Sequence, residues 1–176
     1  TLGPGSTNLE PWELADAVGE ETVAVAYAPG DPTPLSTVCD VAGEHGLPVI
    51  VDGAGRLPPA ENLTRFVDAG ADLVVFSGGK AIRGPQSTGI VAGRADLIGS
   101  IALQALDMDA VAETWDPPEV FVDRDAIDGV PRHGIGRGFK VGKEEIVGLL
   151  RALELFVAED DDARAAEWDG RARRIA

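Results

Sequence analysis

Three short runs of apolar residues, separated by helical patterns, constrain the fold more than any other feature of the sequence. They are Thr22–Ala28 (TVAVAYA), Leu47–Asp52 (LPVIVD) and Asp72–Phe76 (DLVVF). Their apolar residues are consecutive instead of alternating, as in strands buried within a parallel sheet. Strands that alternate with helices of about ten residues form right-handed βαβ units. We therefore predict an α/β fold with a mainly parallel sheet that helices cover on both sides.

Helical patterns fill the segments between these runs and after them. We expect helices over residues 8–19, 35–46, 62–70 and 94–106. Asn8 is the expected N-cap of the first helix. On the second helix, four residues should face the core: Leu35, Val38, Cys39 and Ala42. A fourth strand, Gly89–Gly93, follows Phe76 across a glycine-rich loop with no room for a crossover helix. We therefore expect this strand to return antiparallel to the third.

The sequence changes character at Asp107. Residues 107–131 are acidic and are interrupted by Pro117 and Pro118, which indicates an excursion over the surface. Residues 140–159 have a strongly amphipathic pattern. One side of the expected helix carries Ile146, Leu149, Leu150, Leu153, Phe156 and Val157. A second helix should begin at Asp160–Asp162, because the helix dipole favours carboxylates at that end.

The charge balance narrows the class of partner. The chain has 176 residues, with 30 acidic against 15 basic side chains and a formal net charge of −15. Such a surface repels phosphate backbones, so we do not expect nucleic acid as a partner. Only three of the basic residues are lysines, and aspartate outnumbers glutamate. This composition is typical of proteins adapted to high salt, although an ordinary acidic cytosolic protein is the alternative.

The single cysteine and the lack of long apolar runs exclude several further classes of protein. Cys39 is the one cysteine, so there is no disulfide framework and no cysteine-based zinc site, and we expect a packed thiol. No apolar run approaches the roughly 18 residues of a membrane-spanning helix. The first residues have neither the basic flank nor the apolar stretch of a signal peptide. We therefore expect a cytoplasmic protein with no membrane partner and no metal site.

Polar residues stand where two of the expected strands end. Ligands of open parallel sheets lie beyond the carboxyl ends of the strands, where Asp52, Ser77 and Lys80 follow apolar runs. A lysine against an apolar wall tends to lose its proton and can then form a Schiff base with an aldehyde. An aspartate across the pocket can hold a pyridinium N–H. Ser77 and the backbone N–H groups of Gly78 and Gly79 offer a phosphate cradle.

Together these groups meet the needs of pyridoxal phosphate. The plainer alternative is that Asp52 anchors a loop and that Lys80 is a solvated turn residue. Competing phosphate motifs fail on spacing. A Walker loop would require glycine in place of Val74 and Ser or Thr in place of Ala81. The run GIGRGF lacks the last glycine of a dinucleotide fingerprint, because Phe139 stands there.

A small basic cluster lies before the amphipathic helix. His133 is close in sequence to Arg132, Arg137 and Lys140. In an acidic protein such a cluster is a candidate site for a carboxylate or a phosphate. A loop that merely leads into the helix is an equally good interpretation.

Three segments resemble a known family. Residues 45–55 (HGLPVIVDGAG), 70–94 (GADLVVFSGGKAIRGPQSTGIVAGR) and 134–150 (GIGRGFKVGKEEIVGLL) are similar to the selenocysteine synthase-like group of fold-type I pyridoxal phosphate enzymes. This resemblance implies an aspartate aminotransferase-like large domain and pyridoxal 5′-phosphate as cofactor. It also implies that Lys80 binds the cofactor covalently and that Asp52 faces the pyridine nitrogen. Ser77 is the implied contact of the phosphate or of the lysine loop.

The resemblance also implies a domain organisation. Residues 1–132 correspond to part of the cofactor-binding large domain, without its N-terminal part. Residues 133–176 correspond to a helical segment that leads toward a small C-terminal domain. We therefore expect this chain to be the middle of a longer enzyme that forms a homodimer or a larger oligomer.

The expected function is a pyridoxal phosphate-dependent reaction on a small anionic substrate, an amino acid or an amino-sugar acid. We expect lyase chemistry, with β-elimination of ammonia or another group, and Arg83 or Arg137 as holders of the substrate's anionic group. One alternative is selenium or sulfur transfer onto seryl-tRNA. The segment Leu103–Asp109 lacks the basic residues that selenium-transferring members carry there, which favours the small substrate. The other alternative is a truncated fragment that keeps the fold without turnover.

Overall fold

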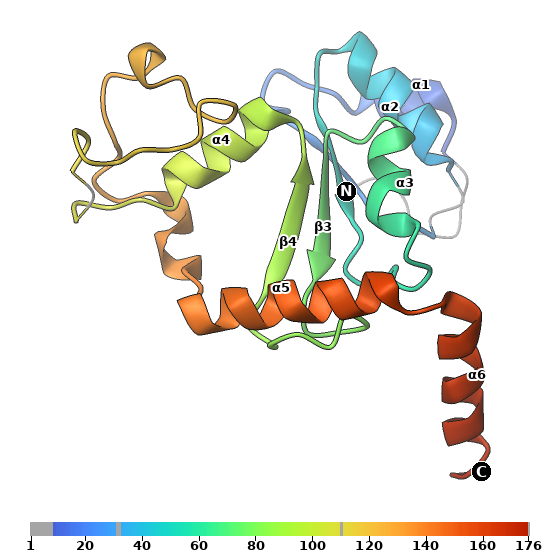
Figure 1. Ribbon diagram of the computed structural model, residues 1–176. Helices are drawn as coiled ribbons and strands as arrows, with labels where there is room; N and C mark the ends of the chain where they lie inside the picture. Colours follow the sequence, from blue (N-terminus) through green and yellow to red (C-terminus); the bar gives the residue numbers. More distant parts are fainter. Residues whose placement is uncertain (1–8, 31–32, 110, 176) are drawn as a thin grey trace.

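A four-stranded sheet forms the centre of the molecule (Figure 1). The computed structural model describes residues 9–30, 33–109 and 111–175. The strands lie in the order β1 (Val25–Tyr27), β2 (Val49–Asp52), β3 (Leu73–Ser77) and β4 (Gly89–Gly93). The first three are parallel, and β4 pairs antiparallel to β3. The α/β class, the mainly parallel sheet and the returning fourth strand are therefore confirmed.

Three helices cover one face of this sheet. They are α1 (Pro11–Asp16), α2 (Leu35–Glu44) and α3 (Asn62–Asp68). Their apolar sides enclose a core with the inward residues of the strands, among them Val51, Val74 and Phe76. Val38 and Ala42 of α2 are buried in it, and Leu35 and Cys39 pack against it, as the sequence predicts. Burial is also the first cause that raises the pKa of the Cys39 thiol.

The opposite face of the sheet is open, and the prediction of helices on both sides is wrong for the described residues. Ala26, Asp52 and Val91 all lie exposed on this face, with Val91 at 40% exposure. The reason is the order of the strands. Successive right-handed crossovers that advance in one direction place their helices on the same side of the sheet. We call the surface formed by Ala26, Ile50, Asp52 and Val75 the open face.

Helix α4 (Ala95–Gln104) follows β4 and anchors the acidic excursion. Two short 3-10 helices, η1 (Arg124–Ala126) and η2 (Ile135–Phe139), are the regular elements between α4 and the next helix in the described residues. A side chain at Gly99 would overlap the Phe121 carbonyl, so the glycine lets the excursion approach α4 closely. The predicted surface excursion is confirmed.

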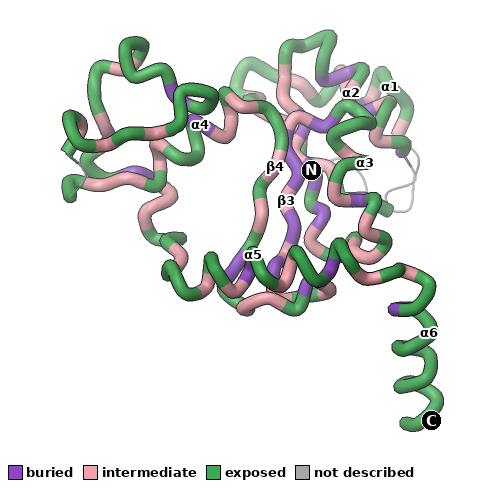
Figure 2. Tube along the Cα trace, viewed as in Figure 1, coloured by how far each residue is buried: buried purple, intermediate pink, exposed green. Residues whose placement is uncertain are grey.

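Helix α5 (Lys143–Ala158) runs across the ends of β3 and β4 and leads into α6 (Asp161–Ala172), which projects away from the sheet (Figure 1). Leu149 and Phe156 are buried against Ile82. The rest of the predicted inward side is only partly covered, because Ile146, Leu150 and Val157 remain 46–56% exposed. Figure 2 shows this contrast along α5. That part of the prediction is wrong for the chain as it stands.

The helix ends show which local signals act. Asn8 lies outside the described residues; Glu10 caps α1, and its backbone N–H donates to the Glu13 carboxylate over 2.8 Å. Asp160 caps α6 by accepting from the backbone N–H of Ala163 over 2.9 Å, in agreement with the predicted acidic start. His45 is exposed at the end of α2. Among the described helices, none has the length and apolar character that crossing a bilayer requires.

Candidate active site

The carboxyl ends of β1, β2 and β3 meet at one edge of the sheet. The described parts of their three connecting loops therefore lie at the same edge: residues 28–30 and 33–34, 53–61 and 78–88. The amino end of the antiparallel β4 joins them there. Parallel α/β sheets place ligands at this edge. The fold thus brings the strand-end residues predicted from the sequence, Asp52 and Ser77, to one place.

Asp52 is the last residue of β2 and lies on the open face. Its Oδ1 atom accepts a hydrogen bond from the backbone N–H of Ala54 over 3.0 Å, which fixes the first turn of the following loop. The carboxylate lies at the end of a shallow depression of about 460 Å³. Small or apolar residues form the floor of this depression, among them Ala26, Ile50 and Val75. A planar apolar group has room there beside one negative charge.

Ser77 lies on the same side of the sheet as Asp52. Asp52 pairs in register with Val75, and Ser77 is two residues farther along β3, so the alternation of side chains returns it to the same face. The spacing between strands and the rise along a strand place the two Cα atoms about 8 Å apart. Within the described residues, Ser77 Oγ has no hydrogen-bond partner. Its hydroxyl is therefore able to donate to an added group.

The loop that carries Lys80 is tightly packed. The backbone N–H of Gly78 donates to the Thr88 carbonyl over 2.9 Å, and that of Gly84 donates to the Gly78 carbonyl over 2.8 Å. A Cβ on Gly78 would lie 2.8 Å from Leu149 Cδ1 and would overlap Thr88 Oγ1. Position 78 therefore requires glycine, because Leu149 and Thr88 leave no space for a side chain. The predicted phosphate cradle loses one donor, since the N–H of Gly78 is already used by Thr88.

Lys80 itself is exposed, and its amine forms no ion pair among the described residues. The expectation of an apolar wall around Lys80 is wrong for the described chain. Helix α5 packs against Gly78 and Ile82 of this loop and leaves Lys80 outside the contact. The amine at the mouth of β3 is thus accessible to an aldehyde or another small reactant.

The two arginines predicted to hold a substrate are both paired with carboxylates. Arg83 Nη2 lies 2.6 Å from Glu159 Oε2 at the end of α5. Arg137, in η2, forms an ion pair with Asp107, and this hydrogen bond is the first cause that lowers the pKa of Asp107. The two guanidiniums belong to different elements, and only Arg83 is part of the Lys80 loop. The basic cluster around Arg137 is the entry to α5, with a 3-10 turn.

Sequence reasoning missed the residues that support this edge from the end of α5. Glu159 and Arg164 join Arg83 in a chain of ion pairs. A signal was present, since an arginine three residues after Asp161 on a helix can pair with it, as Arg164 does here. Nothing in the sequence indicates the pairing of Arg83 with Glu159, because 76 residues separate them.

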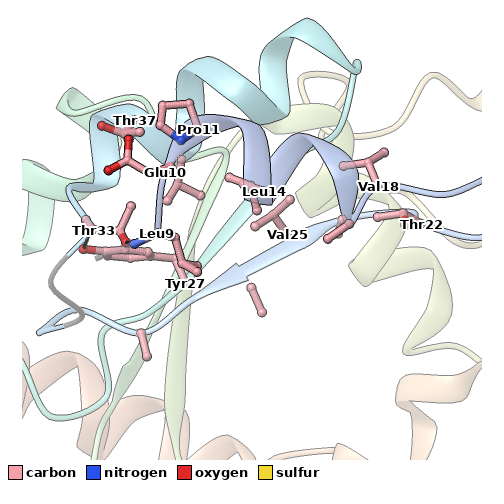
Figure 3. Close-up of a pocket in the computed structure, with 15 residues that line it drawn as sticks. Leu9, Glu10, Pro11, Leu14, Val18, Thr22, Val25, Tyr27, Thr33 and Thr37 are labelled. Carbon is pink, nitrogen blue, oxygen red and sulfur yellow. Dashed lines mark hydrogen bonds between the residues drawn. The ribbon is translucent and has the colours of Figure 1, made fainter. Parts of the chain in front are cut away.

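Another cavity, of about 430 Å³, lies between α1, β1 and α2. Figure 3 shows Leu14, Val18 and Val25 around it, with Tyr27 and Thr33 at one end. Its lining contains none of the residues predicted for the active site. The cavity lies on the helical side of β1 and shares Ala26, Tyr27 and Ala28 with the lining of the depression beside Asp52.

The chain is similar to enzymes of known activity. It is 33% identical, over 98% of its length, to 5′-C-glycyluridine monooxygenase-decarboxylase from Streptomyces sp. It is 31% identical, over 93%, to D-glucosaminate-6-phosphate ammonia lyase from Salmonella typhimurium. Over 68% of its length it is 41% identical to L-seryl-tRNA(Sec) selenium transferase from Serratia proteamaculans. The chain spans 37% of the length of each of the first two relatives and 21% of the third. No protein-family model matches it.

The fold is also similar to that of a solved enzyme structure. A solved structure of D-glucosaminate-6-phosphate ammonia-lyase superimposes on 88% of the chain with a TM-score of 0.60 and 28% sequence identity. The matched part is 35% of that enzyme's chain. The relative named for a monooxygenase and decarboxylase was not anticipated by the sequence analysis.

Proposed function

We propose that the intact protein is a lyase. The chain belongs to the selenocysteine synthase-like group of fold-type I pyridoxal phosphate enzymes, and the proposed lyase is of that kind. Its substrate is a small anionic amino compound, either an amino acid or an amino-sugar acid. The observation that carries the proposal is the meeting of Asp52 and Ser77 on one face of the sheet, at the edge where the Lys80 loop begins.

The residues at this edge fit the cofactor of the group. Pyridoxal phosphate has an aldehyde, a ring nitrogen that is protonated when it faces a carboxylate, and a phosphate. The chain offers a carboxylate at Asp52, a hydroxyl at Ser77 and, at Lys80, an amine that has no ion pair with any residue the structure describes. Ala26, Ile50 and Val75 give the depression beside Asp52 an apolar floor for a flat ring. The donor set and the floor therefore agree with this cofactor.

Each residue has a distinct role in the proposed reaction. Bound pyridoxal phosphate supplies an electron sink for the charge that develops beside the amino group. Lys80 would hold the cofactor through Nζ, and the free amine would serve as the general base for the proton beside the substrate's amino group. Asp52 would keep the proton on the ring nitrogen, and Ser77 would donate a hydrogen bond to the phosphate. This set of residues would support β-elimination of ammonia or another group.

The substrate's anionic group needs a cation. Arg83 and Arg137 remain predictions for this role. Each would have to exchange its present carboxylate, Glu159 or Asp107, for that of the substrate.

Selenium or sulfur transfer onto seryl-tRNA is the alternative. The net charge of −15 and the absence of basic residues in Leu103–Asp109 argue against tRNA. The other alternative is that this chain alone has no turnover. The chain spans about a third of the length of the first two relatives, which agrees with this alternative.

The proposed assembly is a homodimer or a larger oligomer in the cytoplasm. Exposed apolar residues on α5, among them Val147, Leu150 and Val157, are 56–67% exposed and support a further layer of protein over this helix. The domain boundary proposed at residue 132 falls just before η2 and the entry to α5.

The test uses the intact protein loaded with pyridoxal phosphate. Phosphorylated amino sugars and amino acids are added in turn, and ammonia and carbonyl products are measured together with oxygen uptake. Release of ammonia without oxygen uptake is expected for at least one substrate. Oxygen-dependent turnover alone, or specific binding of seryl-tRNA at physiological salt, would overturn the proposed lyase reaction.

A further inference from the structure

A chain of ion pairs joins the end of α5 to the Lys80 loop. The carboxylate of Glu159 is shared between two arginines, because its Oε2 lies 2.6 Å from Arg83 Nη2 and 2.9 Å from Arg164 Nε. Arg83 comes from the loop and Arg164 from α6. One carboxylate thus connects two segments that are far apart in the sequence.

Arg164 is the buried end of this chain. Its side chain is 1% exposed. Nη2 donates to the Phe156 carbonyl over 2.7 Å, and the guanidinium lies 4.2 Å from the centre of the Phe156 ring. Nη1 forms an ion pair with Asp161. A guanidinium desolvated to this degree is held in one position by its partners.

Asp161 extends the same cluster to the loop that follows Asp52. While one carboxylate oxygen of Asp161 pairs with Arg164, the other accepts a hydrogen bond from the backbone N–H of Ala60 over 2.8 Å. Ala60 lies near the end of the loop that connects β2 to α3. The four residues Arg83, Glu159, Asp161 and Arg164, which we call the junction clamp, therefore contact the loop that carries Lys80 and the loop that follows Asp52.

Arg83 links the junction clamp to Lys80 through the backbone. Its φ angle is +63°, a left-handed conformation that a residue other than glycine rarely adopts. Its backbone N–H donates to the Lys80 carbonyl over 2.9 Å. The contacts around such a residue must offset its unfavourable conformation, and such positions occur most often at functional sites. The ion pair with Glu159 is the side-chain contact that the structure gives to Arg83.

We infer that the junction clamp positions the loop that carries Lys80 against the loop that follows Asp52, so that one cofactor meets both residues. The inference rests on the proposed function and assigns Arg83, Glu159, Asp161 and Arg164 as positioning residues. Loss of the clamp leaves Lys80 in the chain but releases the turn that presents it. The orientation of α6 is then coupled to cofactor binding, since Arg164 and Asp161 both belong to α6.

The two arginines differ in what can replace them. Arg83 uses one nitrogen atom and is about half exposed, so a lysine at this position can still reach Glu159. Arg164 uses three nitrogen atoms and stacks on an aromatic ring, which a lysine cannot imitate. We therefore expect Arg83→Lys to keep the contacts of the junction clamp and Arg164→Lys to lose them.

The experiment measures the binding of pyridoxal 5′-phosphate to the intact protein by absorbance, together with the rate at which borohydride fixes the cofactor to Lys80. Glu159→Gln and Arg83→Gln are each expected to weaken binding about tenfold, which corresponds to about 1.4 kcal/mol. Arg83→Lys should stay within about twofold of the wild type. Glu154→Gln is the matched control, because Glu154 pairs with Arg151 on the exposed side of the same helix.

A double variant tests whether the residues act as a unit. Arg83→Gln combined with Glu159→Gln should weaken binding no more than Glu159→Gln alone, since that change already removes the contact with Arg83. Hydrogen exchange in the cofactor-free protein gives a second readout. Residues 78–84 should exchange faster in Glu159→Gln than in Glu154→Gln. This readout does not depend on cofactor or activity.

The outcomes separate the two proposals. If the intact wild type forms no adduct on Lys80, the proposed function fails, and the positioning role fails with it. If the wild type binds but Glu159→Gln and Arg83→Gln bind equally well, the positioning role alone is overturned. Lower thermal stability with unchanged cofactor affinity and unchanged exchange in residues 78–84 would likewise overturn it, because that pattern describes a merely structural ion pair. Glu159→Gln and Arg83→Gln keep the test valid even if Arg164→Lys does not fold.

Discussion

Asp52→Asn separates the charge of this residue from its part in the fold. The asparagine keeps an Oδ1 atom that can accept from the backbone N–H of Ala54, so the turn after β2 is retained. Because the side chain is exposed, the free energy of unfolding should change by less than about 0.5 kcal/mol. What the substitution removes is the negative charge that we propose faces the ring nitrogen of the cofactor.

The expected loss of affinity follows from the kind of contact removed. A hydrogen bond to a charged group contributes about 1.5–3 kcal/mol. Since each 1.4 kcal/mol is a factor of ten, pyridoxal phosphate should bind the Asp52→Asn protein roughly 10- to 150-fold more weakly. The proposed contact would lie beside an open depression and be partly solvated, so the lower end of this range is expected.

The assay is a titration of the intact protein with pyridoxal phosphate, followed by absorbance and paired with thermal unfolding without cofactor. Asp68→Asn is the control, because Asp68 is an exposed carboxylate at the end of α3 and its loss changes the net charge equally. Equal affinity of the Asp52→Asn and Asp68→Asn proteins would refute the role given to Asp52. An unfolding midpoint that falls markedly in Asp52→Asn would refute the reasoning about its turn.

Two further predictions concern the Lys80 loop and its contact with α5. Gly78→Ala should destabilise the protein by about 1–3 kcal/mol in chemical unfolding, because its Cβ would overlap Thr88, whereas Gly55→Ala, with open space around it, should not. The hydrogen bond from Ser87 lowers the pKa of Glu145, so NMR titration should find that pKa nearer its usual value in Ser87→Ala. The stability that this contact adds is present above about pH 4.3 and is lost as the pH falls through the lowered pKa. An unchanged Glu145 pKa would contradict this assignment.

The sequence predicts the sheet and the strand-end residues well because both depend on local patterns. The apolar runs before Asp52 and Ser77 are sufficient to place these residues at the ends of neighbouring parallel strands. The glycine-rich loop before Gly89 is likewise sufficient to predict an antiparallel return. Hydrophobic periodicity and loop length carry this information without reference to the rest of the chain.

The details that sequence reasoning missed depend on contacts between distant residues. The backbone N–H of Gly78 donates to Thr88, and no pattern around Gly78 reveals this. Arg83 pairs with Glu159 because α5 crosses the carboxyl edge, a fact of tertiary structure. The exposed apolar side of α5 was predicted to face inward because amphipathic spacing identifies an apolar side but not its partner.

The most direct test of the central claim is to identify the lysine that carries the cofactor. The intact protein is incubated with pyridoxal phosphate, reduced with borohydride, digested and analysed by mass spectrometry. Within this chain the candidates are Lys80, Lys140 and Lys143. The account predicts a reduced adduct on Lys80 and its loss, with the associated absorbance band, in Lys80→Ala. An adduct confined to Lys140 or Lys143, or a band that persists in Lys80→Ala, would contradict it.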